Sequence, residues 1–261
     1  MMRNVDYDAK YFVSPEAFGD QHIRITGADA HHIVNVMRAK PGFTFLVSDG
    51  SGREAVAVFE SGDGETAIAR LEELVAADRE AAVEVTIAQS LPKGDKMELI
   101  IQKCTELGAA GFLPFLSERT VVQYDAKKEA KRLERWAKIA KEAAEQSHRN
   151  RVPDIAAPAA WAKLIGQFAA YDLVLICYED EQGTRLRDVL EPFCEAQRGQ
   201  EAARILVVIG PEGGFSLREV EAATAAGAVC VSLGRRILRT ETAGLAACAC
   251  IMYQFGEMGG S

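Results

Sequence analysis

The apolar residues of the first 75 positions form short runs separated by glycine-rich turns. The pattern predicts β-strands at residues 22–25, 43–47, 54–59 and 67–71. Asp49-Gly50-Ser51-Gly52 joins the second and third of these as a hairpin, and residues 27–38 are expected to form a short helix that ends before Pro41-Gly42. Several short strands at this spacing predict a small β-barrel.

From residue 78 onward, the pattern changes to alternating strands and helices. Strands are predicted at 83–88, 111–116, 172–178, 205–209 and 228–233, and helices at 95–107, 126–146, 159–168, 184–195, 216–226 and 241–255. Ser216 and Glu219 have the capping-box spacing that marks a helix start. This alternation predicts an α/β domain with a parallel sheet covered on both faces. We therefore expect two domains, a barrel over residues 1–77 and an α/β domain over residues 78–261.

Two of the predicted strands run into loops that expose their backbone. Strand 205–209 is followed by Gly210-Pro211-Glu212-Gly213-Gly214, and strand 228–233 is followed by Gly234 and residues 235–242. The carboxyl ends of parallel strands meet at one edge of the sheet, where α/β domains bind small molecules. Considered alone, the first loop is explained equally well as an ordinary tight turn. The second loop makes a ligand site the better interpretation.

Composition narrows the class of protein. Hydrophobic residues make up 48% of the 261 positions and charged residues 26%, as in ordinary globular proteins. No window approaches the roughly 18 consecutive apolar residues of a membrane span, and the first residues lack the apolar core of a signal peptide. We therefore expect a cytoplasmic protein with no membrane partner. The six cysteines form no CxxC pair and the four histidines are scattered, so no metal site is expected.

The charge distribution bears on nucleic acid as a partner. A net charge of −8 argues mildly against such a partner. However, residues 118–151 contain ten basic and six acidic side chains, and phosphate contacts need only a local basic face. On charge alone, a solvated helix face is the simpler interpretation.

The two backbone-rich loops also carry a family resemblance. GPEGGFS at 210–216 and LGRRILRTETA at 233–243 resemble the cofactor loops of SPOUT-class methyltransferases, and more narrowly those of the RsmE family. Three further stretches resemble patterns of that family: LPKGDKMELIIQKCTELG at 91–108, FLSERT at 115–120 and RWAKIAKEAAEQSHRNRVPDI at 135–155. The resemblance covers the whole chain. It implies a PUA-like RNA-binding barrel followed by a SPOUT-type parallel sheet whose C-terminal chain forms a trefoil knot.

The resemblance further implies an activity. It is methylation of N3 of a specific uridine in 16S ribosomal RNA of the small subunit, with S-adenosyl-L-methionine as the cofactor and no DNA partner. The positions expected to bind the cofactor are Ile209, Gly210, Pro211, Gly213, Gly214, Leu233, Gly234, Ile237, Leu238 and Thr242. SPOUT-like domains pair through a helix near this site. The final predicted helix, apolar on nearly all sides, fits a homodimer.

Catalysis requires that uridine N3 lose its proton. Arg239 is the first candidate to stabilise the resulting anion, and Glu212 is a candidate proton acceptor. A favourable charge at a helix N-terminus explains Glu212 equally well. The positions expected to contact RNA are Arg3, Arg24, Arg38, Arg119, Arg149 and Arg151. A charge cluster at a helix C-terminus accounts for Arg149 equally well.

Two alternative functions remain open at this stage. One is a ribose 2′-O-methyltransferase acting on ribosomal or transfer RNA, which would share the cofactor loops. The other is a ribosome-assembly RNA-binding protein that keeps the fold without the activity.

Overall fold

The structure is a computed structural model that describes residues 7, 9–19, 21–76, 79–122, 126–200 and 202–260. The chain divides into two compact units. The first combines Met1–Glu80 with Ala144–Val152, and the second combines Ala81–Ala143 with Pro153–Ser261. The boundary expected between residues 77 and 78 lies outside the described residues.

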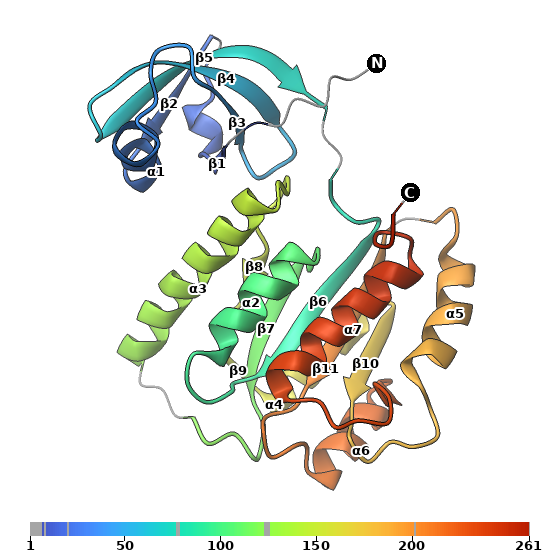
Figure 1. Ribbon diagram of the computed structural model, residues 1–261. Coiled ribbons are helices and arrows are strands. Elements are labelled where there is room, and N and C mark those ends of the chain that lie inside the picture. Colours follow the sequence, from blue (N-terminus) through green and yellow to red (C-terminus); the bar gives the residue numbers. More distant parts are fainter. Residues whose placement is uncertain are drawn as a thin grey trace. The chain divides into compact units, whose positions relative to one another are not determined.

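The first unit is built on a curled five-stranded sheet in the order β1-β3-β4-β5-β2 (Figure 1). Its strands are β1 (Lys10–Phe12), β2 (His22–Thr26), β3 (Thr44–Ser48), β4 (Glu54–Gly62) and β5 (Thr66–Val75). The pair β1–β3 is parallel and the other pairs are antiparallel. Alternate side chains point inward, and Ile23, Ile25, Phe45, Val47 and Phe59 form part of its core. The predicted strands are confirmed, and β1 is an edge strand that the apolar pattern did not predict.

The predicted helix at 27–38 is present in two pieces. They are α1 (Ala28–His31) and the π-helical turn η2 (His32–Val36), preceded in the chain by the 3-10 turn η1 (Pro15–Ala17). The helical segment ends sooner than expected because Arg38 adopts a left-handed backbone with φ of 51°. Glycine is the usual residue at such a helix end, so Arg38 occupies a conformation that an L-residue adopts at a cost.

A buried polar network explains why Ala144–Val152 belongs to the first unit. Lys10 and Glu54 form an ion pair in which both side chains are fully buried. The Asn150 side-chain amide donates to Glu54 over 2.8 Å. Arg149 pairs with Glu80 over 2.5 Å, and Glu80 also accepts the backbone N–H of Asn150 over 2.8 Å. A buried charge is tolerated when it is paired and hydrogen-bonded, and these contacts satisfy the buried charges of Lys10, Glu54 and Arg149.

The second unit contains a seven-stranded sheet in which every strand pair is parallel. The order is β12-β10-β11-β6-β7-β8, and β9 also pairs with β7. The strands are β6 (Val83–Ser90), β7 (Gly111–Leu116), β8 (Asp154–Ile155), β9 (Ala159–Ala160), β10 (Leu173–Cys177), β11 (Ala203–Ile209) and β12 (Val229–Val231). The parallel sheet is therefore confirmed. The short strands β8 and β9 were not predicted.

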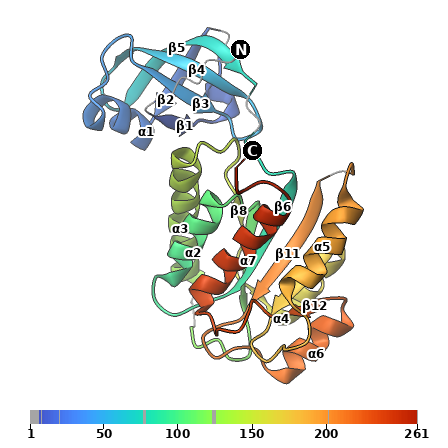
Figure 2. The same ribbon diagram turned by 45° about the vertical axis from the view of Figure 1, so that its right-hand side comes forward.

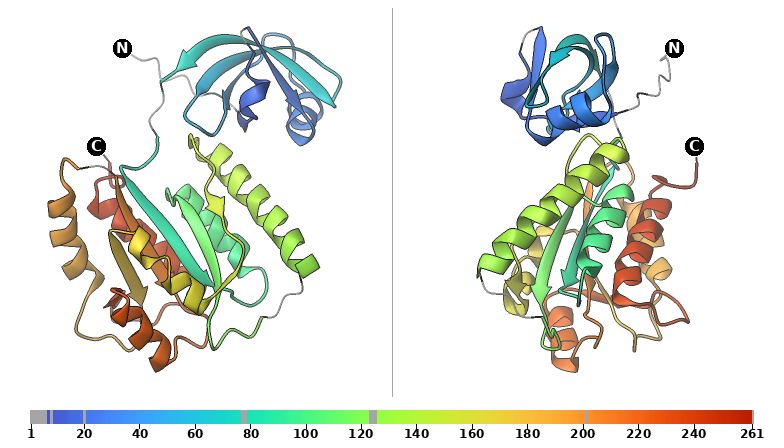
Figure 3. Two further views of the ribbon diagram at one scale, coloured as in Figure 1. Left: turned by 180° about the vertical axis from the view of Figure 1, so that it is seen from behind. Right: turned by 60° about the vertical axis from the view of Figure 1, so that its left-hand side comes forward.

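Helices cover both faces of this sheet (Figures 1 and 3). They are α2 (Lys96–Glu106), α3 (Ala126–Gln146), α4 (Trp161–Ile165), α5 (Leu186–Gln197), α6 (Leu217–Ala225) and α7 (Thr240–Gln254), with the 3-10 turn η3 (Phe168–Ala170) after α4. Helices α2 and α7 pack together on one face, and α4 and α6 lie on the other. The helix predicted at 159–168 is shorter than expected because its first two residues extend the sheet.

Two details of the helices bear on the site. The capping box is confirmed, since the Ser216 hydroxyl accepts the N–H of Glu219 and the Glu219 carboxylate accepts the N–H of Ser216. Helix α7 packs over β6 and β11, and Gly244 lies close to Ile87 and Ile209.

No helix in the described part of the chain is long and apolar enough to cross a membrane. The trefoil knot stays a prediction.

Candidate cofactor and active site

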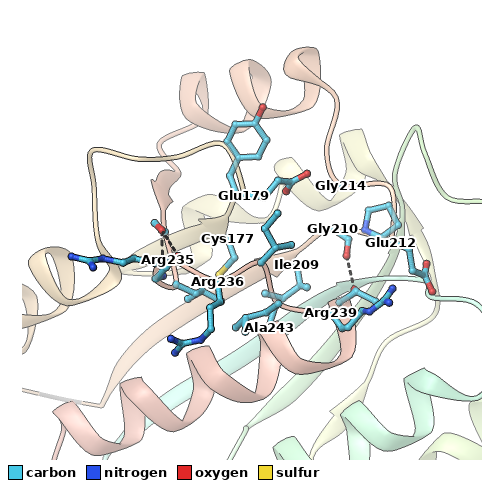
Figure 4. A pocket seen from close by; sticks show the side chains of 18 residues that line it. Cys177, Glu179, Ile209, Gly210, Glu212, Gly214, Arg235, Arg236, Arg239 and Ala243 are labelled. Carbon is cyan, nitrogen blue, oxygen red and sulfur yellow. Dashed lines mark hydrogen bonds between the residues drawn. The ribbon is translucent and has the colours of Figure 1, made fainter.

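A cavity of about 400 Å³ lies at the carboxyl edge of the parallel sheet (Figure 4). Figure 2 shows that β11 ends near the start of α7 at this edge. It is bounded by the ends of β10 and β11 and by the segment that leads from β12 into α7. The residues that line it are 177–179, 209–212, 214, 232–240 and 243. This volume falls within the range of small-molecule sites.

Most of the predicted site residues meet at this cavity. Those that line it are Ile209, Gly210, Pro211, Glu212, Gly214, Leu233, Gly234, Ile237, Leu238 and Arg239. Gly213 and Thr242 are not among the lining residues. The carbonyl of Gly213 instead accepts a hydrogen bond from the Arg119 guanidinium over 2.7 Å. The Thr242 side chain is exposed.

The sequence reasoning missed a third wall of the cavity and five residues in and around the second loop. Cys177 ends β10, and Tyr178 and Glu179 follow it. The five other missed lining residues are Ser232, Arg235, Arg236, Thr240 and Ala243. The signal for the third wall was available, because residues 172–178 were predicted as a strand of the same parallel sheet. Extending the carboxyl-edge rule to that strand would have pointed to Glu179.

The loop between β12 and α7 presents backbone groups to the cavity. Neither the N–H nor the C=O of Leu233, Ile237 or Leu238 forms a hydrogen bond with another described residue. Gly234 has φ of 121°, and a Cβ added to it would meet no atom within 4 Å. Since backbone polar groups in proteins are nearly always paired, this loop has the donors and acceptors to hold a polar ligand.

Gly214 in the first loop faces the Glu179 carboxylate. Its φ is 67°, and a Cβ added to it would overlap with the Oε1 atom of Glu179. Only glycine therefore allows this approach. The Glu179 carboxylate has no hydrogen-bond or ion-pair partner among the described residues, and it lines the cavity (Figure 4).

Glu212 and Arg239, the two predicted catalytic residues, lie on the same side of the cavity (Figure 4). Glu212 accepts hydrogen bonds from the Lys96 ammonium over 2.9 Å and from the N–H of Lys93 over 3.1 Å. Partial burial opposes ionisation of Glu212, but these donors hold its pKa below the usual value. The exposed Arg239 guanidinium makes no hydrogen bond to any described residue, and its backbone carbonyl accepts the N–H of Ala243 at the start of α7.

The predicted RNA-binding arginines have different surroundings. In the first unit, Arg24 lies on an exposed position of β2 and Arg38 is exposed after η2. In the second unit, Arg119 is exposed and holds the carbonyl of Gly213. Arg3 lies outside the described residues.

The last two of these arginines lie in the segment that follows α3. Arg149 is only 5% exposed, and its guanidinium pairs with Glu80. Arg151 is exposed, and its backbone N–H also donates to Glu80 over 3.0 Å. Glu80 therefore fixes the backbone from which Arg151 projects.

No group of three or more His, Cys, Asp or Glu side chains is arranged to hold a metal ion in the part of the chain that the structure describes. The six cysteines are free thiols. Burial raises the pKa of the Cys177 thiol, which lines the cavity, to about 12. This thiol is therefore protonated at neutral pH.

Comparison with known proteins identifies the family. The chain matches the RNA methyltransferase domain family over residues 79–252 and the RNA methyltransferase PUA domain family over residues 25–72. It is 42% identical to ribosomal RNA small subunit methyltransferase E of Bacillus subtilis (strain 168), over 88% of this chain and 89% of that protein. It is 39% identical to the enzyme of the same name from Synechocystis sp., over 88% of this chain and 73% of that protein.

Solved structures agree with the sequence comparison. The crystal structure of ribosomal RNA small subunit methyltransferase E from Neisseria gonorrhoeae bound to S-adenosyl methionine has a TM-score of 0.83 and 30% identity, covering 94% of this chain and 97% of that one. A methyltransferase from Legionella pneumophila in complex with the cofactor also gives a TM-score of 0.83, with 29% identity, covering 94% of this chain and 96% of that one. The chain thus belongs to the ribosomal RNA small subunit methyltransferase E family of RNA methyltransferases.

Proposed function

We propose that this protein transfers a methyl group from S-adenosyl-L-methionine to N3 of a specific uridine in 16S ribosomal RNA of the small subunit. The observation that carries the proposal is the cavity itself. It combines unpaired backbone groups on the Leu233–Leu238 segment with the Arg239 guanidinium, which has no partner among the described residues. One side of the site is suited to holding a nucleoside-like cofactor, and the other to stabilising negative charge.

The residues of the cavity fit this cofactor. The backbone groups of Leu233, Ile237 and Leu238 can hydrogen-bond an adenine edge, and the apolar side chains of Leu238 and Ala243 can wall the base. The unpartnered Glu179 carboxylate can accept hydrogen bonds from ribose hydroxyls. When bound, S-adenosylmethionine supplies a methyl group that its sulfonium has already made electrophilic. The protein therefore needs to orient the two reactants more than to activate the donor.

Catalysis also requires that the negative charge that develops on the uracil be stabilised. As N3 loses its proton, negative charge spreads to O2 and O4, and the Arg239 guanidinium would stabilise it there. Glu212 stays the candidate proton acceptor. Its lowered pKa makes it a weak base, so we expect Glu212→Gln to slow methylation less than Arg239→Ala does.

We expect the ribosomal RNA to be bound mainly through contacts between its phosphates and exposed arginine side chains. Arg24 and Arg38 are exposed in the unit that matches a PUA domain, and they would contact phosphates, as would Arg119 and Arg151. This substrate implies a cytoplasmic location, with neither DNA nor a membrane as a partner. The burial of Arg149 against Glu80 favours a structural role for that residue over direct contact with RNA.

A homodimer is part of the proposal. Helix α7 carries no charged residue from Ala243 to Tyr253, yet Cys250 and Tyr253 remain exposed on it, with Tyr253 at 68%. Light scattering at micromolar concentration should return twice the chain mass of 28.3 kDa. A mass equal to one chain would remove the dimer from the proposal and leave the chemistry in place.

The reaction is tested with radiolabelled cofactor and small subunits isolated from a strain that lacks this enzyme. After the reaction, the RNA is digested to nucleosides, which are then separated. We expect the label in N3-methyluridine. Label in a ribose-methylated nucleoside would favour the 2′-O alternative, and no incorporation would favour the non-catalytic RNA-binding alternative.

A further inference from the structure

A chain of three hydrogen-bonded groups connects the parallel sheet to both cofactor loops. The Gln89 side-chain amide, at the end of β6, donates to the Thr240 hydroxyl over 2.9 Å. The Thr240 hydroxyl donates to the carbonyl of Gly210 over 2.6 Å. Gln89 is fully buried and Thr240 is 7% exposed, so both bonds are largely shielded from bulk water. Gly210 begins the first cofactor loop, and Thr240 ends the second.

The direction of each bond follows from the chemistry of the groups. The Gln89 amide also contacts the carbonyl of Ser90 over 2.9 Å. A carbonyl only accepts, so the atom that faces Ser90 must be the Gln89 nitrogen, which then also donates to Thr240. The Thr240 hydroxyl has one proton, and this proton is directed to Gly210. The geometry therefore permits one arrangement of donors and acceptors.

This arrangement leaves one polar atom unsatisfied. Oε1 of Gln89 is buried and has no hydrogen-bond partner among the described residues. A buried acceptor without a partner is destabilising, and such groups are rare in native proteins. The hydrogen bonds made by the Gln89 amide nitrogen must therefore outweigh this cost. One of them orients the Thr240 hydroxyl so that its proton points to the Gly210 carbonyl.

Thr240 is also placed to influence the site itself. It lines the cavity, and it directly follows Arg239, the residue proposed to stabilise charge on the uracil. We infer that the Thr240 hydroxyl, oriented by Gln89, is a positioning group that fixes the two cofactor loops relative to each other and sets the backbone from which Arg239 projects. This inference rests on the proposed function, because it assigns the hydroxyl a part in cofactor binding.

The test compares Thr240→Val with Thr240→Ser. Valine keeps the shape of threonine and removes the hydroxyl, whereas serine keeps the hydroxyl and removes a methyl group. We expect T240V to weaken S-adenosylmethionine binding in calorimetry at least about tenfold, since it leaves the Gly210 carbonyl without the Thr240 donor and the Gln89 amide with only the Ser90 carbonyl as a partner. T240S keeps the hydroxyl and its hydrogen bonds. Its affinity for S-adenosylmethionine should therefore stay within about threefold of the wild-type value.

The matched control is Thr224→Val. Thr224 is an exposed helical threonine on α6, its hydroxyl donates to the Val220 carbonyl over 2.9 Å, and it does not line the cavity. T224V should leave cofactor affinity unchanged. If T240V behaves like T224V, or if T240S is as impaired as T240V, the inference is overturned.

A second variant keeps the test decisive if T240V does not fold. Gln89→Met removes the amide with little change in side-chain length, and it should also weaken cofactor binding. In the double variant, the loss should be smaller than the sum of the two single losses, because both changes interrupt the same connection. Normal affinity in Q89M would contradict the inference. Failure of the wild-type protein to bind the cofactor would instead refute the proposed function.

Discussion

Replacing Gly234 by valine should remove cofactor binding without unfolding the protein. Gly234 follows β12 and lines the cavity with φ of 121°, and its α-carbon faces open space. A side chain there would extend into the volume that we assign to S-adenosylmethionine. A non-glycine residue held in a sparsely populated region of backbone space costs on the order of 1–3 kcal/mol, and a β-branched residue at positive φ is among the least favourable. That cost lowers stability but falls short of the roughly 5–15 kcal/mol that holds a domain folded.

Gly227 provides a matched control for the backbone cost. It precedes β12, has φ of 97° and also faces open space, but it does not line the cavity. Gly234→Val and Gly227→Val should therefore lose similar free energies of unfolding, measured by urea denaturation. Only the first should fail to bind S-adenosylmethionine.

Calorimetry separates the two effects. At cofactor concentrations that saturate the wild type, Gly234→Val should give no binding heat while its far-UV circular dichroism stays unchanged. Gly227→Val should bind with the affinity of the wild type. If Gly234→Val also binds normally, the cavity has been assigned to the wrong ligand.

Three further predictions concern single side chains. Arg38→Gly relieves the φ of 51° and should raise the free energy of unfolding by up to about 1 kcal/mol, yet weaken RNA binding and reduce its salt slope by about one unit; loss of stability would contradict this. Arg239→Ala should lower the single-turnover methylation rate far more than it lowers RNA affinity in filter binding, and equal losses would refute its proposed role. Although burial opposes ionisation of Glu80, the Arg149 pair and two backbone N–H groups hold its pKa below the usual value. Its stabilising contribution is therefore present above the usual carboxyl pKa and is lost as pH falls through the folded-state value. Glu80→Gln should be less stable than the wild type at pH 7 and should lose less stability on acidification, and an unchanged pH dependence in urea denaturation would count against the pairing.

Local patterns were sufficient to predict most of the fold. The strongly periodic segments became β2 to β7, β10 to β12, α2, α3 and α4 to α7, and the Ser216–Glu219 spacing became a true capping box. Short edge strands such as β1 and β8 contain too few residues to show a period. No local signal could assign Ala144–Val152 to the first unit. Contacts such as Asn150 with Glu54, which are 96 positions apart in sequence, decide that assignment.

The two loops that line the cavity could likewise be located from local patterns, whereas other parts of its lining could not. Glycine and proline mark the two loops directly in the sequence. The family resemblance suggested Thr242, but it is Thr240 that lines the cavity, as the first residue of a helix that starts one residue before its predicted start. Residues two positions apart on a helix point to nearly opposite sides, so Thr240 faces the cavity and Thr242 faces solvent.

The most direct test of the account is the modification itself in cells. Small-subunit RNA is purified from a strain that lacks this protein, and from the same strain supplied with the wild-type chain or with Gly234→Val. The nucleosides are then quantified by mass spectrometry. The account predicts that N3-methyluridine is absent from the deletion strain, returns with the wild-type chain and does not return with Gly234→Val. N3-methyluridine at normal levels in the deletion strain, or its return with Gly234→Val, would contradict the account.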